Sequence, residues 1–379
     1  GLNAPDAPTG VSGTAGDTTV SVSFTSPSDV GGSAITEYLV ADSTKAHTAT
    51  GSSSPITVTG LTNGTSYTFN VWAINAFGWS VASDASDAVA PEVPTRAVFA
   101  GGNSGSVSNV IDYITIQTLG NAADFGDLTV AREYIAAASS STRGVFAGGD
   151  PSRATIDYIT LASTGNATDF GDLTVARDDP AGASNNTRAL FIGGAVGSDD
   201  MIDYVTIATT GNATDFGDIY RPAYSIAACS SPTRAVTGGY NTFGADTLED
   251  TMEYLTIAST GNATDFGNLT SRRYGCGAGS SPTRGVFAGG YLTGSLSQID
   301  YVTIATTGNA TSFGDLTVAR QDMGGTSSHT RAVFGGGSNP TNTIDYVTIG
   351  TTGDAVDFGD LTVSRNTLDA CSANHGGLS

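Results

Sequence analysis

The stretch TGNATDFGDLTVAR, at residues 164–177, decides the fold because most of it is repeated along the chain. Close copies begin at Thr210, Thr260 and Thr307, and copies with more substitutions begin at Leu119 and Thr352. A second landmark is a recurring Thr-Arg dipeptide, whose arginines are Arg96, Arg143, Arg188, Arg234, Arg284 and Arg331. Their successive spacings are 47, 45, 46, 50 and 47 residues, a period typical of propeller blades or of helical repeats.

The composition favours strands over helices in these repeats. The chain has 50 glycines and only 13% charged residues, so it lacks the Glu and Lys that surface helices use. In the second complete repeat we expect four strands, at residues 136–141, 143–149, 156–163 and 169–177. Four short strands in each of six repeats predict an all-β, six-bladed β-propeller, because each sheet needs a neighbour to bury its faces.

The first ninety residues are a different module. Alternating stretches at 18–24 and 66–74, separated by turn residues, predict a small antiparallel sandwich. This region resembles a fibronectin type III domain, through APTGVSG near the start, Pro27 and Tyr38, and LTNGTSYTFNVWAINAFGWS from Leu61. The resemblance implies a Tyr67 hydroxyl bonded back to the chain, inward Phe69, Val71 and Ala73, and a spacer or adhesive role without an active site. We expect domains at 1–93 and 94–379.

The repeats resemble kelch-type propellers. A Gly-Gly doublet closes the second strand of each copy, a Tyr follows in the third strand, and Phe stands where kelch blades usually have Trp. We place the doublets at 101–102, 148–149, 193–194, 238–239, 289–290 and 336–337. First-strand segments are built from small residues, as a crowded axis requires. The repeats start at the second strand, at Thr95, and a lone first-strand segment follows from Leu368. We therefore expect the C-terminal strand to complete the first blade.

Charge and cysteine usage narrow the classes of partner. The net charge of −21 and pI near 4.1 predict no nucleic-acid partner, and no apolar run is long enough for membrane insertion. Cys229, Cys276 and Cys371 are predicted to be buried thiols. The start GLNAPDAPTG lacks Met and a signal-peptide pattern, which predicts a piece processed from a longer protein.

No cofactor, metal or catalytic group is expected. Three scattered histidines give neither the His pair of kelch-type copper oxidases nor another metal motif, and the sialidase box is absent. Paired Asp residues such as Asp169 and Asp172 leave Ca²⁺ binding open, although Asn268 and Ser312 break the pattern. Twelve arginines are predicted to be structural partners of the repeated Asp residues, and Arg153 and Arg273 are placed outside the recurring positions.

Variation between copies indicates where a ligand binds. The copies differ after the Gly doublet and again after the fourth-strand Arg, and in a four-stranded meander these two connections emerge on one face. We call it the variable face and assign recognition to it. The fourth repeat has the longest insertion there, from Tyr240 to Met252. Aromatic rings stack on sugars and amides bind their hydroxyls, so the predicted site residues are Tyr240, Asn241, Phe243, Tyr291, Tyr224, Arg273 and Tyr274.

The repeats also resemble tail fibre or other virion surface proteins of marine phages, especially those of cyanobacteria. This resemblance implies a non-catalytic attachment protein on the virion surface, extracellular after release, that binds a host surface glycan or receptor protein and contacts other virion or tail subunits. The alternative is a secreted bacterial carbohydrate-binding or carbohydrate-processing protein. Convergent Asp or Glu side chains with a His or Tyr on the variable face would favour processing.

Overall fold

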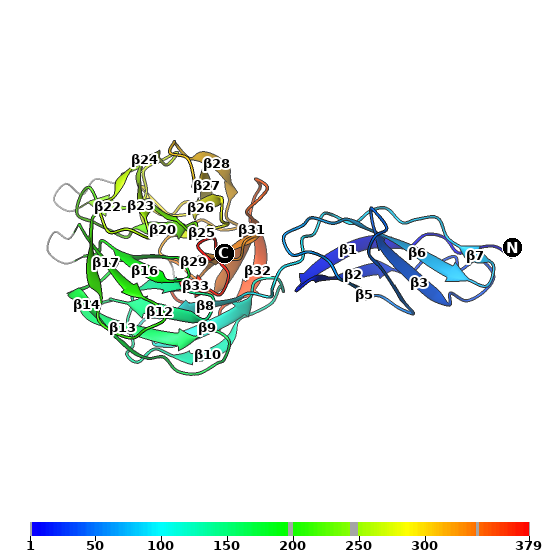
Figure 1. Cartoon of the computed structure of the whole chain (residues 1–379), viewed down its shortest axis with the longest axis horizontal. Helices are drawn as coiled ribbons and strands as arrows, with labels where there is room; N and C mark the ends of the chain where they lie inside the picture. The colour runs from blue at the N-terminus through cyan, green and yellow to red at the C-terminus, as the bar shows by residue number, and fades with distance from the viewer. Residues whose placement is uncertain (1, 196–199, 243–248, 339–340, 379) are drawn as a thin grey trace. The chain divides into compact units, whose positions relative to one another are not determined.

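The structure, a computed structural model, describes residues 2–195, 200–242, 249–338 and 341–378. All regular secondary structure in this part of the chain is β-strand, which confirms the all-β prediction (Figure 1). The chain divides into two compact units, Gly1–Pro94 and Thr95–Ser379.

The first unit is a sandwich of two antiparallel sheets. One sheet has the order β1-β2-β5 and the other β4-β3-β6-β7. Their bounds are β1 Thr9–Gly16, β2 Thr19–Thr25, β3 Glu37–Asp42, β4 Thr48–Gly51, β5 Ile56–Thr59, β6 Phe69–Asn75 and β7 Gly78–Trp79. Phe69, Val71 and Ala73 are fully buried between the sheets, and the Tyr67 hydroxyl accepts the Thr62 N–H at 3.1 Å. Both features are as predicted.

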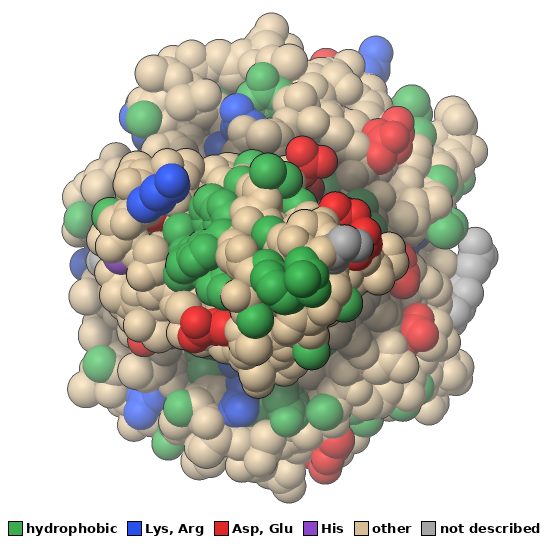
Figure 2. All heavy atoms as spheres, turned by 90° about the vertical axis from the view of Figure 1, so that its right-hand side faces the viewer, with side chains coloured by type: hydrophobic (Ala, Val, Ile, Leu, Met, Phe, Trp, Pro, Cys, Tyr) green, Lys and Arg blue, Asp and Glu red, His purple; other side chains and the backbone are tan. Residues whose placement is uncertain are grey.

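Apolar side chains also gather on the surface of the first unit. Figure 2 shows them at the end where β7 and the N-terminus lie. Leu2, Phe77 and Trp79 are exposed there.

In its described residues, the second unit consists of six four-stranded antiparallel sheets and one two-stranded ribbon. Sheet 1 contains β33 Asp369–Ser372, β8 Arg96–Ala100, β9 Val110–Thr115 and β10 Ala123–Asp127. Sheet 2 contains β11 Ala136–Ser139, β12 Arg143–Ala147, β13 Arg153–Thr160 and β14 Thr168–Arg177. Sheet 3 contains β15 Ala181–Ser184, β16 Arg188–Ile192, β17 Met201–Thr206 and β18 Thr214–Asp218.

The remaining sheets follow the same order. Sheet 4 contains β20 Ala227–Ser230, β21 Arg234–Gly238, β23 Thr251–Thr256 and β24 Thr264–Asn268. Sheet 5 contains β25 Gly277–Ser280, β26 Arg284–Ala288, β27 Gln298–Thr303 and β28 Thr311–Asp315. Sheet 6 contains β29 Gly324–Ser327, β30 Arg331–Gly335, β31 Thr343–Thr348 and β32 Val356–Asp360, and the ribbon pairs β19 Ala223–Tyr224 with β22 Asn241–Thr242. The predicted long fourth strand exists only as β14, and elsewhere that strand has five residues.

The C-terminal strand joins the first sheet. β33 pairs antiparallel with β8, with Ala370 opposite Phe99, so the predicted pairing of the chain's end is confirmed. The first strands of the six sheets contact one another in the cyclic order β33, β11, β15, β20, β25, β29 and again β33. These innermost strands are almost entirely buried and, apart from Asp369 in β33, are built from Ala, Gly, Ser, Thr and Cys, which lets them approach closely.

Six serines link the ends of these innermost strands. The Ser139 hydroxyl donates to the Ser372 carbonyl at 2.7 Å, and the Ser184 hydroxyl donates to the Ser139 carbonyl at 2.8 Å. The same contact recurs at each neighbouring pair and returns to its start through Ser230, Ser280, Ser327 and Ser372. We call this set the serine ring. Every sheet is thereby hydrogen-bonded to both neighbours.

The repeated stretch makes the outer contacts between sheets. The Asn166 side-chain oxygen accepts the Asp127 N–H of the preceding sheet at 3.1 Å. Equivalent contacts at 3.1 Å join all six neighbouring pairs, through Asn121, Asn212, Asn262, Asn309 and Asp354. A side chain at Gly171 would lie 2.5 Å from the Gly211 carbonyl oxygen of the next sheet, so this close approach requires glycine. The repetition therefore reflects identical sheet-to-sheet contacts.

The arginines of the Thr-Arg dipeptides also connect neighbouring sheets. Arg143 lies over the Tyr158 ring, 4.3 Å from its centroid, and donates to the Ile207 carbonyl of the next sheet at 2.8 Å. The other five do the same, ending with Arg331 on the Ile116 carbonyl of sheet 1. The prediction that these arginines pair with repeated Asp residues is wrong, because a tyrosine face and a carbonyl occupy them instead.

Candidate functional site

The two sets of variable loops lie on one face of the second unit, as the strand order predicts. The Asp150 N–H donates to the Glu133 carbonyl at 2.8 Å, which joins the loop after a second strand to the loop after a fourth strand. Tyr291 and Tyr274 make the equivalent backbone contact at 2.8 Å. Both loop sets therefore lie at the same end of the space that the innermost strands enclose.

The residue two positions before each innermost strand adopts a left-handed backbone conformation. These residues are Tyr134, Asp179, Ser225, Gly275, Asp322 and Thr367, with φ between 53° and 64°. Neighbours bond along the backbone, for example from the Asp179 N–H to the Tyr134 carbonyl and from the Thr367 N–H to the Asp322 carbonyl, both at 2.8 Å. We call these six the turn ring. The turn ring places six residues, one from each repeat, around one centre.

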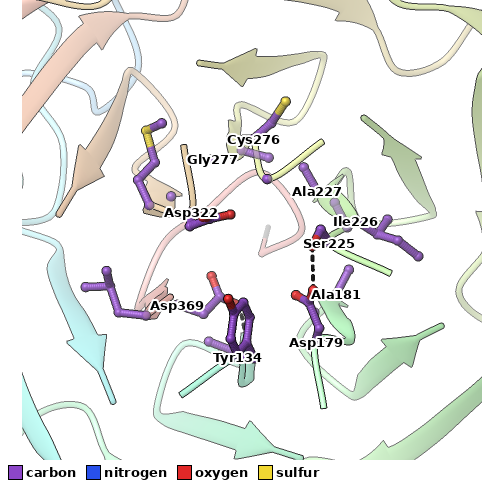
Figure 3. Close-up of a pocket in the computed structure, with 18 of the residues that line it drawn as sticks. Tyr134, Asp179, Ala181, Ser225, Ile226, Ala227, Cys276, Gly277, Asp322 and Asp369 are labelled. Carbon is purple, nitrogen blue, oxygen red and sulfur yellow. Dashed lines mark hydrogen bonds between the residues drawn. The ribbon is translucent and has the colours of Figure 1, made fainter. Parts of the chain in front are cut away.

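The turn ring borders a pocket on the axis of the second unit (Figure 3). The pocket, including its open mouth, has a volume of about 620 Å³. Tyr134, Asp179, Ser225 and Asp322 line it above the innermost strands, and Asp369 lines it deeper. The Asp369 carboxylate accepts the backbone N–H groups of Ala137 and Ala370, at 2.7 and 2.8 Å. That carboxylate therefore links β33 to β11.

Carboxylates dominate the electrostatics of this pocket. Burial raises the pKa of Asp179 to about 8, against hydrogen bonds from Ser225, and the charges of Asp322 and Asp178 raise it further. Burial also raises the pKa of Asp322, and it raises the pKa of Asp369 to about 7. Burial followed by the charges of Asp322 and Asp179 raises the pKa of Tyr134. Asp179, Asp322 and Tyr134 therefore act on one another inside a shared, poorly solvated space.

The C-terminal tail occupies the axis beside the serine ring. His375 Nε2 lies 3.2 Å from the Ser184 hydroxyl, and His329 Nε2 lies 2.7 Å from the Leu378 carbonyl. Burial lowers the pKa of His375 to about 4. The tail thus fills the space within the serine ring, while the turn ring surrounds the pocket mouth.

Three predicted site residues gather at that mouth. Tyr224 and Tyr274 line it together with Asp179 and Asp322. Tyr291 packs on Tyr274, with ring centroids 5.5 Å apart. The Asn241 side-chain amide donates to the Tyr224 hydroxyl at 2.8 Å and so positions that ring from behind. Phe243 lies outside the described residues.

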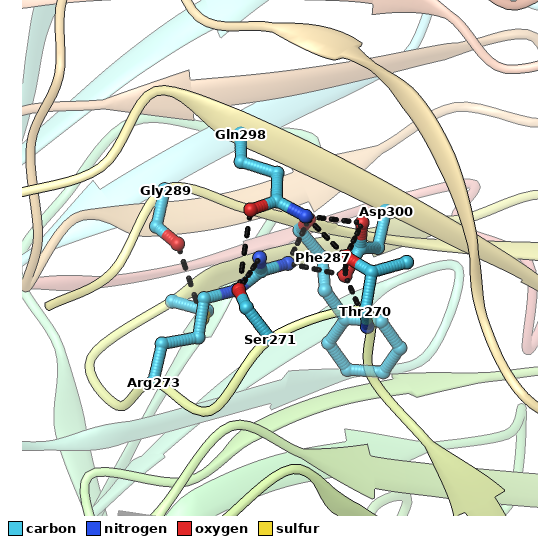
Figure 4. Close-up of polar contacts among 8 residues, drawn as sticks. Thr270, Ser271, Arg273, Phe287, Gly289, Gln298 and Asp300 are labelled. Carbon is cyan, nitrogen blue, oxygen red and sulfur yellow. Dashed lines mark hydrogen bonds and ion pairs between the residues drawn. The ribbon is translucent and has the colours of Figure 1, made fainter. Parts of the chain in front are cut away.

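Arg273 is not a surface ligand residue. It is fully buried and its Nη2 pairs with Asp300 Oδ2 at 2.9 Å, within a network that includes Thr270 and Ser271 (Figure 4). The same pair occurs between neighbouring sheets as Arg132–Asp157, Arg177–Asp203, Arg320–Asp345 and Arg365–Asp112. Arg273 is therefore the recurring arginine, and Arg272 is the additional one. The sequence prediction had these two adjacent residues in the wrong order.

Tyr240 is a core residue rather than a ligand residue. Gly238 pairs with Ala227 as Ile192 pairs with Ala181, so Tyr240 takes the place of the second glycine of the doublet, Gly194 in sheet 3. The doublet predicted at 238–239 is therefore misplaced by one residue. Tyr240 is only 5% exposed and packs in the cluster that contains Ala223 and Leu255.

Three linked substitutions explain this tyrosine. A side chain at Gly194 would lie 3.1 Å from Arg177 Cδ, so the second glycine makes room for the buried arginine. Between sheets 3 and 4 the arginine is replaced by Ala223, the glycine by Tyr240 and the aspartate by Glu253. Glu253 accepts the Tyr220 N–H at 3.1 Å, and burial raises its pKa to about 7, against that hydrogen bond and the charge of Arg221.

Replacing Tyr240 by glycine is expected to lower the free energy of unfolding by about 3–5 kcal/mol, because it leaves a cavity beside Ala223. Adding Ala223→Arg and Glu253→Asp should recover most of the loss by rebuilding the arginine pair of the other junctions. Urea unfolding of the single and triple variants measures the loss of stability and its recovery. A single variant as stable as the parent chain would show that Tyr240 does not support the core.

Sequence reasoning missed Tyr134, Asp179 and Asp322. Each stands two residues after a recurring arginine, at Arg132, Arg177 and Arg320. Aligned on that position, which is Arg in five copies and Ala223 in the sixth, the six copies present Tyr, Asp, Ser, Gly, Asp and Thr two residues later. The signal was a single variable column beside a nearly constant arginine. This signal is weaker than that of a long insertion. The insertion at residues 240–252 therefore drew the site prediction.

Comparison with known proteins concerns the first unit. The family model of the fibronectin type III domain matches residues 6–89, which include both sheets of the sandwich and the Tyr67 contact. Residues 6–89 form a fibronectin type III domain. No curated protein matched the chain. The fibronectin type III domain is a generic binding module, and its core is closed and apolar.

Two other kinds of site are not found among the described residues. Within the described parts of the chain, no helix is long and apolar enough to cross a membrane. Among the same residues, no three His, Cys, Asp or Glu side chains come together in a way that could hold a metal ion. The three cysteines are buried and unpaired by disulfides.

Proposed function

We propose that the second unit is a six-bladed, kelch-like β-propeller that binds a ligand in its axial pocket. The cyclic contacts of the innermost strands support this, together with the serine ring and the six Asn or Asp contacts of the repeated turn. In such a ring each sheet covers the next, so the loops of one face can vary without loss of the core. The fibronectin type III domain then serves as a spacer or adhesive module.

We propose further that the protein is a non-catalytic attachment protein of a virion, a tail fibre or a related surface component. It would recognise a host surface glycan or receptor protein through the variable face. The observation that carries this proposal is the axial pocket, where tyrosines and hydroxyl or carboxylate groups from different sheets converge on the variable face. Tyrosine faces pack on sugar rings, and carboxylates accept sugar hydroxyls.

A carbohydrate-processing function is the second candidate. Asp179 and Asp322 converge with Tyr134 on the variable face, which is the arrangement that favours this alternative. A carboxyl group with a raised pKa, such as Asp179, is suited to donate a proton to a leaving group. Hydrolysis of a polysaccharide by the purified protein, abolished by Asp179→Asn, would establish processing in place of attachment.

The attachment proposal predicts glycan or cell binding that depends on the tyrosines of the mouth. Tyr274→Ala and Tyr224→Ala should each weaken binding at least about tenfold, which corresponds to roughly 1.4 kcal/mol. Tyr220→Ala is the matched control, because Tyr220 is 76% exposed and does not line the pocket. A glycan array and binding to whole marine cyanobacterial cells measure the effect, with melting temperatures recorded in parallel. Full binding by both mouth variants would move recognition to the fibronectin type III domain or another face.

A further inference from the structure

We propose that the axial pocket binds its ligand through a positively charged ammonium group held between the carboxylates of Asp179 and Asp322. This inference rests on the proposed binding function and gives the chemical class of the ligand. An amino sugar of a surface glycan and a free alkyl amine share this group, and the experiment below separates them.

The charge of the pocket favours a cation. The described residues that line the pocket and its mouth include Asp178, Asp179, Asp322 and Asp369, but no Lys, Arg or His. An anionic ligand would bring further negative charge into a space where carboxylates already repel one another. A cation instead supplies the opposite charge that these buried carboxylates lack within the protein.

The geometry places two carboxylates on opposite sides of the axis. The innermost strands follow the cyclic order β33, β11, β15, β20, β25, β29. Asp179 precedes β15 and Asp322 precedes β29, three places apart in a ring of six. Tyr134 precedes β11, and the residue opposite it is Gly275, which has no side chain to compete for the centre. Figure 3 shows Asp179 and Asp322 facing each other across the pocket beside the Tyr134 ring.

Both carboxylates retain acceptor capacity. Asp179 accepts the Ser225 hydroxyl, and Asp322 accepts the Gln321 side-chain amide at 3.0 Å. A carboxylate offers about four lone-pair sites, and an ammonium group carries three N–H donors. The tyrosine rings at 134, 224 and 274 add faces that attract a cation. A metal ion fits less well, since no described trio of ligating side chains converges to hold one.

Calorimetric titration tests this assignment with the full chain. The probes are the glucosamine disaccharide, its N-acetylated counterpart and 1,5-diaminopentane, with CaCl₂ as the metal arm. The glucosamine disaccharide should bind at least about tenfold more tightly than the acetylated one, since acetylation removes the charge. Binding of diaminopentane as well would identify the ammonium group itself, whereas binding of the sugar alone would assign an amino sugar. Equal binding of both disaccharides, or binding of Ca²⁺ without either amine, would overturn the proposal.

Two carboxamide variants locate the site. Asp179→Asn and Asp322→Asn should each weaken binding of the amine at least about tenfold. Asp215→Asn is the matched control, because Asp215 is an exposed aspartate on β18 and lies outside the pocket. Glycan-array binding that depends on Tyr274 but not on either aspartate would leave the proposed function standing and reject the ammonium site. Binding of the amine without any glycan or cell binding would support the ammonium site and reject the proposed attachment function.

The pH dependence supplies an independent readout. The pKa of Asp179, about 8, exceeds its ordinary 3.8, and Ser225, Asp178, Asp322, Tyr134 and Tyr274 are the groups around it. The alkyl ammonium groups of 1,5-diaminopentane keep their charge to about pH 10. The affinity of this probe should therefore rise between pH 6 and 9 as Asp179 ionises. Because the folded state holds this proton more tightly, Asp179 destabilises the fold increasingly as pH rises from about 4 to 8. Asp179→Asn should therefore raise the melting temperature at pH 9, whereas loss of a merely structural carboxylate would lower it.

Discussion

Ending the chain at Arg365 is expected to lower the free energy of unfolding of the second unit by roughly 5 kcal/mol or more. The deletion removes β33, so β8 loses its innermost partner and the serine ring loses Ser372. It also removes Leu368, Cys371 and Leu378, which are 2–4% exposed. Burying each leucine contributes about 1.5–3 kcal/mol, and an open strand edge adds to the loss.

A second truncation separates the contribution of β33, which closes the ring, from that of the tail, which fills the axis. Ending the chain at Ser372 removes the tail with His375 and Leu378 but keeps β33, so its melting temperature should lie between those of the other two chains. A synthetic peptide of residues 366–379, added to the chain that ends at Arg365, should raise the melting temperature in proportion to the logarithm of its concentration. An unchanged melting temperature after the longer deletion would contradict the role of β33 in closing the ring.

The strand plan of this chain is readable from its sequence because each contact between sheets repeats. The Asn of TGNAT, the Gly of DFG and the arginine that ends the stretch each meet a partner in a neighbouring sheet. Closely similar sets of partners at the six junctions leave six similar sequence signals. For the same reason, the strand from Leu368 could be assigned to the first sheet, since only that sheet lacked a first strand.

The exception between sheets 3 and 4 was not predictable in this way. Ala223, Tyr240 and Glu253 are separated by 17 and 13 residues, and each alone reads as a local irregularity. Their common cause is one buried volume that holds an arginine at the other five junctions. Only the three-dimensional register shows that Tyr240 fills it. An aromatic residue at the start of a long loop was therefore mistaken for a ligand residue.

The candidate site was predicted in part for a related reason. Tyr224, Tyr274 and Tyr291 were found because aromatic residues in variable loops are conspicuous in sequence. Asp179 and Asp322 lie 143 residues apart and are ordinary members of an acidic chain. Their meeting depends on closure of the ring, which places residues three repeats apart on opposite sides of one axis. Their role follows from position and burial, which residue type alone does not reveal.

Replacing Arg177 by alanine is expected to lower the free energy of unfolding by about 3–5 kcal/mol, because it leaves the Asp203 carboxylate buried without its cation. Arg177 Nη1 lies 2.9 Å from Asp203 Oδ2, and both side chains are fully buried. Arg177 Nη2 also donates to the Phe191 carbonyl at 3.2 Å, so the variant removes a contact between sheets as well. Urea unfolding measures the change in the second unit. The transition is monitored by far-UV circular dichroism, whose signal does not depend on the tryptophans.

A double-mutant cycle separates the ion pair from the loss of packing. In Arg177→Met with Asp203→Asn, the amide still accepts the Thr174 hydroxyl, which donates to Asp203 at 2.7 Å, and no uncompensated charge remains. The double variant should therefore be more stable than Arg177→Ala. The single variants Arg177→Met and Asp203→Asn complete the cycle, which should give a coupling of about 0.5–3 kcal/mol between the two positions. Arg221→Ala is the control, since Arg221 is 55% exposed and its contact with Glu249 is at 3.4 Å, so it should cost about 0–1 kcal/mol. If Arg177→Ala cost no more than Arg221→Ala, the buried pairs would not be what holds neighbouring sheets together, and the stability of the ring would rest on its serine and asparagine contacts and on apolar packing.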